Sequence, residues 1–171
     1  MVVFDSAVLL LFLNPNAKTE ADQAARRIKY LIETLAADKE KIVIPTPVLS
    51  EILVHAGPAM PRYLDELNVA SVFRIAPFDQ RAAIECALVI KDSLDRGGLR
   101  VDASDPVATR AKVKFDRQIV AIAKVEGAHT IYTDDDDVVA YARQAGIRTH
   151  RTAELDLPPD DPQHSMDFGG G

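Results

Sequence analysis

Short apolar runs alternate with longer amphipathic segments along the chain, and this alternation predicts the secondary structure. The runs typical of buried strands are residues 2–4, 41–45, 72–77 and 129–133, with a more polar one at 148–152. Segments with helical spacing of apolar residues lie between them, at 6–13, 19–38, 46–57, 78–98, 105–127 and 137–145. Strands that alternate with helices predict an α/β fold, here a three-layer α/β/α sandwich with a mostly parallel central sheet.

Several residues between these segments are typical of helix ends. Asp5 or Ser6 is placed to cap the helix that follows the first strand. Thr46 suits the N-cap of the next helix, with a proline after it, and Gly57 suits its end. Gly146 closes the helix predicted over 137–145.

Composition narrows the class of protein. With 171 residues, 47% of them hydrophobic and 27% charged, the chain suits one globular domain. Its longest apolar run, residues 7–13, is far shorter than the ~20 residues of a membrane span, so we expect no membrane partner. The start of the chain lacks the basic region of a signal peptide and carries Asp5, and the single cysteine, Cys86, sits in an apolar pattern. We expect Cys86 in the core and the protein in the cytoplasm.

The formal net charge of −6 is unevenly distributed. Residues 154–171 hold five acidic residues and no lysine or arginine, which leaves 20 basic and 21 acidic residues in 1–153. We therefore expect a near-neutral domain over 1–153, followed by an acidic, Pro- and Gly-rich tail over 154–171 that is disordered or loosely docked. The overall acidity does not exclude a nucleic-acid partner.

Four acidic residues fall where ligands bind in a parallel α/β sheet, beyond the carboxyl ends of the strands. Asp5 and Asp135 follow predicted strands, Glu51 lies about one helical turn after another, and Asp116 borders the buried face of a helix. Several carboxylates in one place favour a hard cation with oxygen ligands, Mg²⁺ or Mn²⁺. The histidines are scattered, so zinc is not indicated, and neither a phosphate-binding glycine loop nor a nucleophile-elbow motif occurs.

Each acid also has an ordinary structural explanation. Asp5 can be only a helix cap, a role that contributes ~1 kcal/mol. Glu51 can pair with a Lys or Arg in a partly buried site, and Asp116, among basic residues, can form a surface ion pair. The run of aspartates over 134–137 can be a solvated turn that favours a helix N-terminus. Each explanation is adequate for a single residue, but none of them explains why several acids fall at the same edge of the sheet.

The chain resembles PIN-domain proteins of the VapC-like toxin type. The segments that carry the resemblance are VVFDSAVLL, IPTPVLSEIL, FDRQIVAIAKVEGAHTIYTDDDDV and GIRTH, in the family's order and within residues 1–152. The resemblance implies a metal-dependent ribonuclease whose acidic set is Asp5, Glu51, Asp116 and Asp135, with Mg²⁺ or Mn²⁺ as cofactor.

The resemblance also suggests a role for each residue. Asp5 and Asp135 would be the principal metal ligands, and Asp137 a further candidate. Glu51 and Asp116 would be ligands or partners of ligands, either one able to orient or deprotonate the attacking water. Ser6 and Thr133 would position ligands or the phosphate, and the residues placed to contact RNA phosphates are Arg110, Lys112, Lys114 and Arg117, although a solvated basic face explains these four nearly as well.

Two further interpretations stay open. The protein is either an endoribonuclease, in one version the toxin of a toxin–antitoxin pair with a small antitoxin partner, or a non-catalytic RNA-binding or scaffold protein on the same fold. A phosphatase with an aspartyl nucleophile is disfavoured, because Ala7 stands where a second acid is needed. A homodimer is expected with either, and the segment 19–38 is a candidate face for the antitoxin or the dimer, although core packing explains it as well.

The four consecutive aspartates need not share one role. Asp135 is the predicted metal ligand, because it is the acid of the Thr133–Asp135 pair in the T-x-D motif. We expect Asp134 and Asp136 to face water or to cap the following helix.

Overall fold

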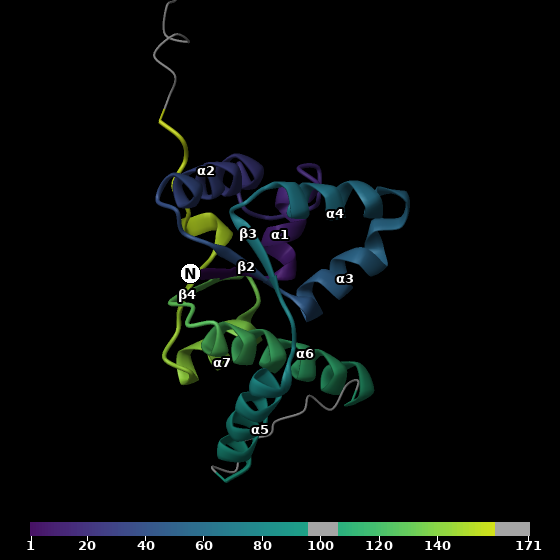
Figure 1. Cartoon of the computed structure of the whole chain (residues 1–171), viewed down its shortest axis with the longest axis vertical. Coiled ribbons are helices and arrows are strands. Elements are labelled where there is room, and N and C mark those ends of the chain that lie inside the picture. Colours follow the sequence, from purple (N-terminus) through teal and green to yellow (C-terminus); the bar gives the residue numbers. More distant parts are fainter. Residues whose placement is uncertain (96–105, 160–171) are drawn as a thin grey trace, which may run out of the picture.

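The computed structural model describes residues 1–95 and 106–159, with the backbone alone for 92–95 and 106–113. Figure 1 shows helices on both sides of a central sheet, with α1, α2 and α4 on one side and α5, α6 and α7 on the other. The predicted three-layer α/β/α sandwich is confirmed.

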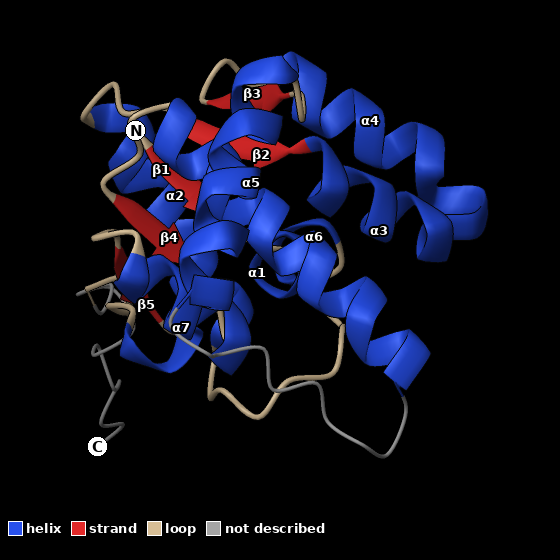
Figure 2. Cartoon of the chain, turned by 90° about the horizontal axis from the view of Figure 1, so that it is seen from below, coloured by secondary structure: helices blue, strands red, loops and turns tan. Residues whose placement is uncertain are grey.

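The central sheet has five parallel strands in the order β3-β2-β1-β4-β5 (Figure 2). They are β1 (Val2–Phe4), β2 (Ile42–Pro45), β3 (Phe73–Ala76), β4 (Thr130–Tyr132) and β5 (Arg148–His150). Every residue of β1 and β2 is buried, which explains their continuous apolar sequences: both faces of these strands are covered. The first strand lies in the middle of the sheet, so the ends of β1 and β4 are neighbours although they are far apart in sequence.

The helices follow the strands in the predicted alternation. They are α1 (Ser6–Leu13), α2 (Ala24–Ala37), α3 (Thr46–Ala56), α4 (Met60–Val69), α5 (Gln80–Asp95), α6 (Pro106–Val125) and α7 (Asp136–Gln144), with short 3₁₀ turns at Gly57–Ala59 and Thr152–Glu154. Helices α3 and α4 extend beyond the carboxyl edge of the sheet (Figure 2). They border the region beside the strand ends, where the predicted site lies.

The core lies between the sheet and both helix layers. Its largest fully buried side chains include Phe4, Leu9, Ile28, Ile44 and Ile122. Cys86 is only 7% exposed, which confirms the prediction that it is a buried residue. Within the described part of the chain, no helix is long and apolar enough to cross a membrane.

Three local predictions are corrected by the structure. Helix α2 begins at Ala24 rather than at Thr19, because Gln23 before it takes a left-handed conformation with φ of 52°. The structure adds α4 to the predicted series, with Tyr63 and Leu67 buried one helical turn apart. Thr46 is the first residue of α3 and not its N-cap; its hydroxyl instead accepts a hydrogen bond from the Phe78 N–H at 3.0 Å.

The chain remains in contact with the domain after β5. Leu155 is 7% exposed and belongs to the core, and its carbonyl accepts a hydrogen bond from Arg27 of α2. The predicted boundary between residues 153 and 154 remains a prediction, since residues 160–171 lie outside the described part of the chain.

Candidate metal centre and active site

Asp5 and Asp135 are neighbours because the sheet pairs the strands that precede them. Phe4 at the end of β1 is paired with Tyr132 at the end of β4, and the Asp5 N–H donates to the Tyr132 carbonyl at 3.1 Å. Each aspartate is then the N-cap of the next helix, Asp5 of α1 and Asp135 of α7. The side-chain oxygens of both residues therefore stand at the positive ends of helices, where a carboxylate is favoured.

Asp5 is a buried acid held by hydrogen bonds. It is 4% exposed, and one of its oxygens accepts from the Ser6 N–H at 2.7 Å and from the Ser6 hydroxyl at 3.4 Å. Its other oxygen accepts from the Thr133 hydroxyl at 2.7 Å. Burial raises the pKa of Asp5, the charges of Asp135 and Glu51 raise it further, and the Thr133 and Ser6 hydrogen bonds oppose the rise.

Thr133 connects the two strand ends. Its side chain is fully buried; the hydroxyl donates to Asp5 and accepts from the Asp135 N–H at 3.0 Å. One hydroxyl therefore fixes both the orientation of the Asp5 carboxylate and the backbone from which Asp135 projects. The role implied by the resemblance, in which Thr133 positions metal ligands or the phosphate, remains a prediction.

Three carboxylates converge next to Asp5. Asp116 on α6, Asp135 and Asp137 each place an oxygen within 4.8 Å of the others. Asp116 is 6% exposed, Asp135 is half-buried and Asp137 is exposed, so the cluster runs from the interior to the surface. Asp116 therefore lies in the interior and not on the solvated surface.

A pocket of about 320 Å³ opens over these acids. Glu51 on α3 is exposed and also lines the pocket, close enough to raise the pKa of Asp5. The described residues that line it are Asp5, Ser6, Ser50, Glu51, Val54, His55, Phe115, Asp116, Ile119 and Asp135. The structure thus brings together the four acids of the predicted set, with Ser6 among them.

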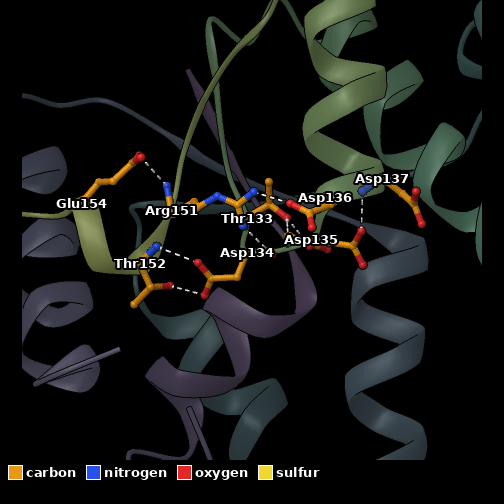
Figure 3. A network of polar contacts seen from close by, with 9 residues as sticks. Thr133, Asp134, Asp135, Asp136, Asp137, Arg151, Thr152 and Glu154 are labelled. Atoms are coloured by element: carbon orange, nitrogen blue, oxygen red, sulfur yellow. Dashed lines mark hydrogen bonds and ion pairs between the residues drawn. The ribbon is translucent and has the colours of Figure 1, made fainter. Parts of the chain in front are cut away.

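The four consecutive aspartates have four different settings (Figure 3). Asp135 and Asp137 turn toward the acid cluster, and Asp135 accepts the Asp137 N–H at 2.8 Å. Asp136 is exposed and pairs with Arg151. Asp134 points the other way and accepts from the N–H of Thr152 at 2.8 Å and from its hydroxyl at 2.7 Å. The expectation that Asp134 faces water or caps α7 is wrong: it holds the chain after β5.

The predicted RNA-contacting residues are only partly described. Lys114 is exposed, whereas the side chains of Arg110 and Lys112 lie outside the described residues. Arg117 is 5% exposed, and its guanidinium lies 5.1 Å from the centre of the Tyr141 ring. A side chain buried in this way presents no surface to a phosphate, so the prediction that Arg117 contacts RNA is corrected: it packs between helices instead.

Several residues that line the pocket were not predicted from the sequence. Val54 and His55 follow Glu51 by three and four residues on α3, so their side chains share its side of the helix. Phe115 precedes Asp116 and fits the apolar spacing of α6, yet 45% of it is exposed at the pocket. The spacing from Glu51 could have predicted Val54 and His55, whereas nothing in the sequence indicated that Phe115 would be exposed.

The residues present fit a hard divalent cation. All side chains in the cluster offer carboxylate oxygen, the ligand type that Mg²⁺ and Mn²⁺ prefer, and no thiol or imidazole belongs to it. Asp5 lies beside the cluster in a setting that disfavours its negative charge, and a nearby cation would stabilise that charge. The cluster Asp116, Asp135 and Asp137 is therefore able to hold a metal ion.

No protein-family model and no curated protein matches this chain. Solved structures do. A chain in the crystal structure of VapBC2 from Rickettsia felis bound to a promoter DNA fragment superposes with a TM-score of 0.60 and 15% identity, over 88% of this chain and 98% of that one. DNA-bound VapBC from Salmonella typhimurium gives a TM-score of 0.57 and 16% identity, over 88% and 97%. FitAB bound to the IR36 DNA fragment gives 0.61 and 17%, over 91% and 98%.

These matches span nearly the whole of each chain, so the likeness is one of the complete fold and not of a shared supersecondary motif. The predicted fold, shared with these VapBC and FitAB chains, is confirmed.

Proposed function

We propose that this protein is a metal-dependent endoribonuclease that hydrolyses RNA phosphodiester bonds. The observation that carries the proposal is the convergence of carboxylates from four elements of a PIN-like fold on one open pocket. Helix capping accounts for Asp5 and Asp135 one at a time, but it accounts for neither the buried Asp116 nor the exposed Glu51.

Asp116, Asp135 and Asp137 would hold Mg²⁺ or Mn²⁺, with Asp5 as a ligand or a close partner. Such an ion supplies charge that stabilises a phosphate oxygen and lowers the pKa of a bound water. Thr133 keeps the Asp5 carboxylate in place, and Ser6 does so from the other side. Because ligands held by a second set of hydrogen bonds lose less freedom on binding, this support favours metal affinity.

Glu51 is the residue placed to handle the proton of the attacking water. It lines the pocket with the other acids and is exposed, so its carboxylate is free to approach a water at the scissile phosphate. The water oxygen forms a new bond to phosphorus and one phosphorus–oxygen ester bond breaks, while Glu51 accepts the proton that the water releases and the leaving ribose oxygen takes up a proton from solvent. Lys114, on the exposed side of α6, would attract the neighbouring phosphates.

The test is cleavage of labelled single-stranded RNA by the wild-type protein and two variants. In Mg²⁺, wild type and Asp65→Asn cleave, whereas Asp135→Asn does not, and EDTA abolishes all cleavage. Asp65 is an exposed aspartate on α4 away from the pocket, which makes it a matched control. Binding of RNA without cleavage would contradict the proposal and favour the alternative, a non-catalytic RNA-binding protein.

We further propose that the nuclease is a toxin held inactive by a small antitoxin. The three structural matches are all two-component complexes, VapBC or FitAB, and this supports the proposal. Co-expression with the small reading frame next to its own gene should yield a complex without RNA cleavage. A neighbour that neither binds nor inhibits would contradict it. A homodimer and a cytoplasmic location remain predictions, the first testable by light scattering.

A further inference from the structure

Two exposed apolar side chains from different helices face the same acidic pocket. Phe115 of α6 is 45% exposed and Val54 of α3 is 74% exposed, and both line the pocket with Ile119 beneath them. The next residues on the apolar face of α6, Ile119 and Ile122, are 2% and 1% exposed. Among the described side chains of this face, Phe115 is thus the one that is exposed, and it lies at the pocket.

The position of Phe115 relative to the acids is fixed by the helix. It directly precedes Asp116, which is buried in the carboxylate cluster, so α6 sets the backbone position of Phe115 relative to the acids. The pocket consequently has two chemical halves. One is made of carboxylates at the strand ends, and the other is an apolar wall with an aromatic ring.

A nucleotide of RNA matches both halves at once. A cation held by the carboxylates attracts its phosphate, and an aromatic ring offers a face on which its base stacks. An apolar side chain of a peptide would contact only the apolar wall and would leave the carboxylates without a partner from the ligand. A base within a duplex has both faces covered by its neighbours, so only an unpaired base is able to stack on Phe115.

We infer that Phe115 is a specificity-determining residue that stacks on an unpaired base next to the scissile phosphate and so selects single-stranded RNA. Val54 supports the edge of the base from α3. This inference rests on the proposed function, because it places the base relative to a phosphate that is being cleaved.

The experiment compares steady-state cleavage of a mixed-sequence, end-labelled RNA, either single-stranded or annealed to its complement. Wild type, Phe115→Ala, Phe115→Leu, Phe115→Trp and the control Val69→Ala are measured in Mg²⁺. Val69 is 84% exposed on α4 and does not line this pocket, so its loss removes exposed apolar surface of a similar kind elsewhere. Mn²⁺ affinity is measured for each variant to show that the acid cluster is intact.

Loss of one stacked base corresponds to roughly 1–3 kcal/mol, which is an increase of about 5- to 100-fold in KM. We expect this increase for Phe115→Ala and Phe115→Leu on single-stranded RNA, with kcat and Mn²⁺ affinity nearly unchanged. Phe115→Trp and Val69→Ala should stay close to wild type. Annealed RNA should be a poor substrate for wild type and should respond little to the loss of the ring.

Three outcomes would overturn the inference. If wild type cleaves RNA and the KM of Phe115→Ala is unchanged, no base stacks on Phe115, although the proposed function still holds. Rescue by leucine as well as by tryptophan shows apolar packing instead of stacking. Loss of a co-purified small protein from Phe115→Ala, with RNA cleavage intact, assigns the wall to a protein partner. Absence of cleavage by wild type defeats the proposed function itself, and the inference with it.

Discussion

The hydroxyl of Thr133 donates a hydrogen bond to a carboxylate oxygen of Asp5 at 2.7 Å, joining residues 128 positions apart in the sequence. Both residues are buried, so this contact orients a carboxyl group that is itself almost inaccessible to solvent. The same hydroxyl accepts the Asp135 N–H, and it thereby couples the ends of the two central strands.

Thr133→Val keeps the shape of the side chain and removes both hydrogen bonds. Because it leaves a buried carboxylate short of a donor, we expect the free energy of unfolding to fall by about 1–3 kcal/mol. We also expect Mn²⁺ affinity to fall by about 10- to 100-fold, as for other residues that support metal ligands. Urea unfolding and calorimetric Mn²⁺ titration measure the two effects. Thr133→Ser retains the hydroxyl and should recover most of both; equal losses in Ser and Val would contradict this role.

Asp5 makes stability depend on pH in the absence of divalent cations. Its pKa is raised above the ordinary value of 3.8, mainly by burial and then by the charges of Asp135 and Glu51, so the folded state binds its proton more tightly than the unfolded state. Stability therefore falls as the pH rises from the ordinary value through the raised one, and the cost persists above it. In EDTA at neutral pH, Asp5→Asn should unfold at a higher temperature than wild type.

Asparagine also caps helices well, so Asp5→Asn retains the start of α1. Mg²⁺ should stabilise wild type much more than the variant, because the cation compensates a charge that asparagine lacks. A lower melting temperature of Asp5→Asn in EDTA, or an equal response of both proteins to Mg²⁺, would contradict this account of Asp5.

Asp134 and Asp136 should be separable from the catalytic acids. Asp134→Ala removes two hydrogen bonds to the buried Thr152, and we expect a loss of about 1–3 kcal/mol in unfolding free energy. Asp136→Ala breaks an exposed ion pair with Arg151 and should change stability by less than about 1 kcal/mol. Both folded variants should retain Mg²⁺-dependent cleavage. Loss of cleavage in folded Asp134→Ala would show that the division of roles is wrong.

Asp137 provides a test of the extent of the metal site. Its carboxylate is exposed but within 4.8 Å of oxygens of Asp116 and Asp135. Asp137→Asn should weaken Mn²⁺ binding less than Asp116→Asn does, because the exposed ligand is replaced more readily by water. Calorimetric titration of the two variants side by side measures the order. A larger loss in Asp137→Asn would place the ion nearer the surface than we propose.

The sequence predicted those features of the site that follow from strand ends. Asp5 and Asp135 each follow an apolar strand, and parallel pairing of those strands brings them together. The positions of Glu51 and Asp116 in predicted helices placed them near the same edge, and the resemblance to PIN domains then assigned both to one acidic set. The settings of Asp134 and Arg117 were not predictable, since each depends on a contact with a residue distant in sequence, Thr152 and Tyr141.

The start of α2 and the exposure of Phe115 were not predicted correctly, for a similar reason. Helical spacing extended the predicted helix back over turn residues to Thr19. Gln23, which takes a left-handed conformation just before α2, is not a residue type that marks such a position as clearly as glycine does. Phe115 fits the apolar period of α6, but period alone does not show where the covering layer stops. Both errors arise from tertiary context, which local pattern does not contain.

The central claim is that a cation held by these carboxylates is required for RNA cleavage. The most direct measurement follows Mn²⁺ binding and RNA cleavage in one titration of metal-free wild-type protein. We predict that cleavage is absent without metal, rises in proportion to the occupied site, and is lost with that site in Asp116→Asn. Cleavage that persists in excess EDTA, or a fully occupied site without any cleavage, would contradict the account.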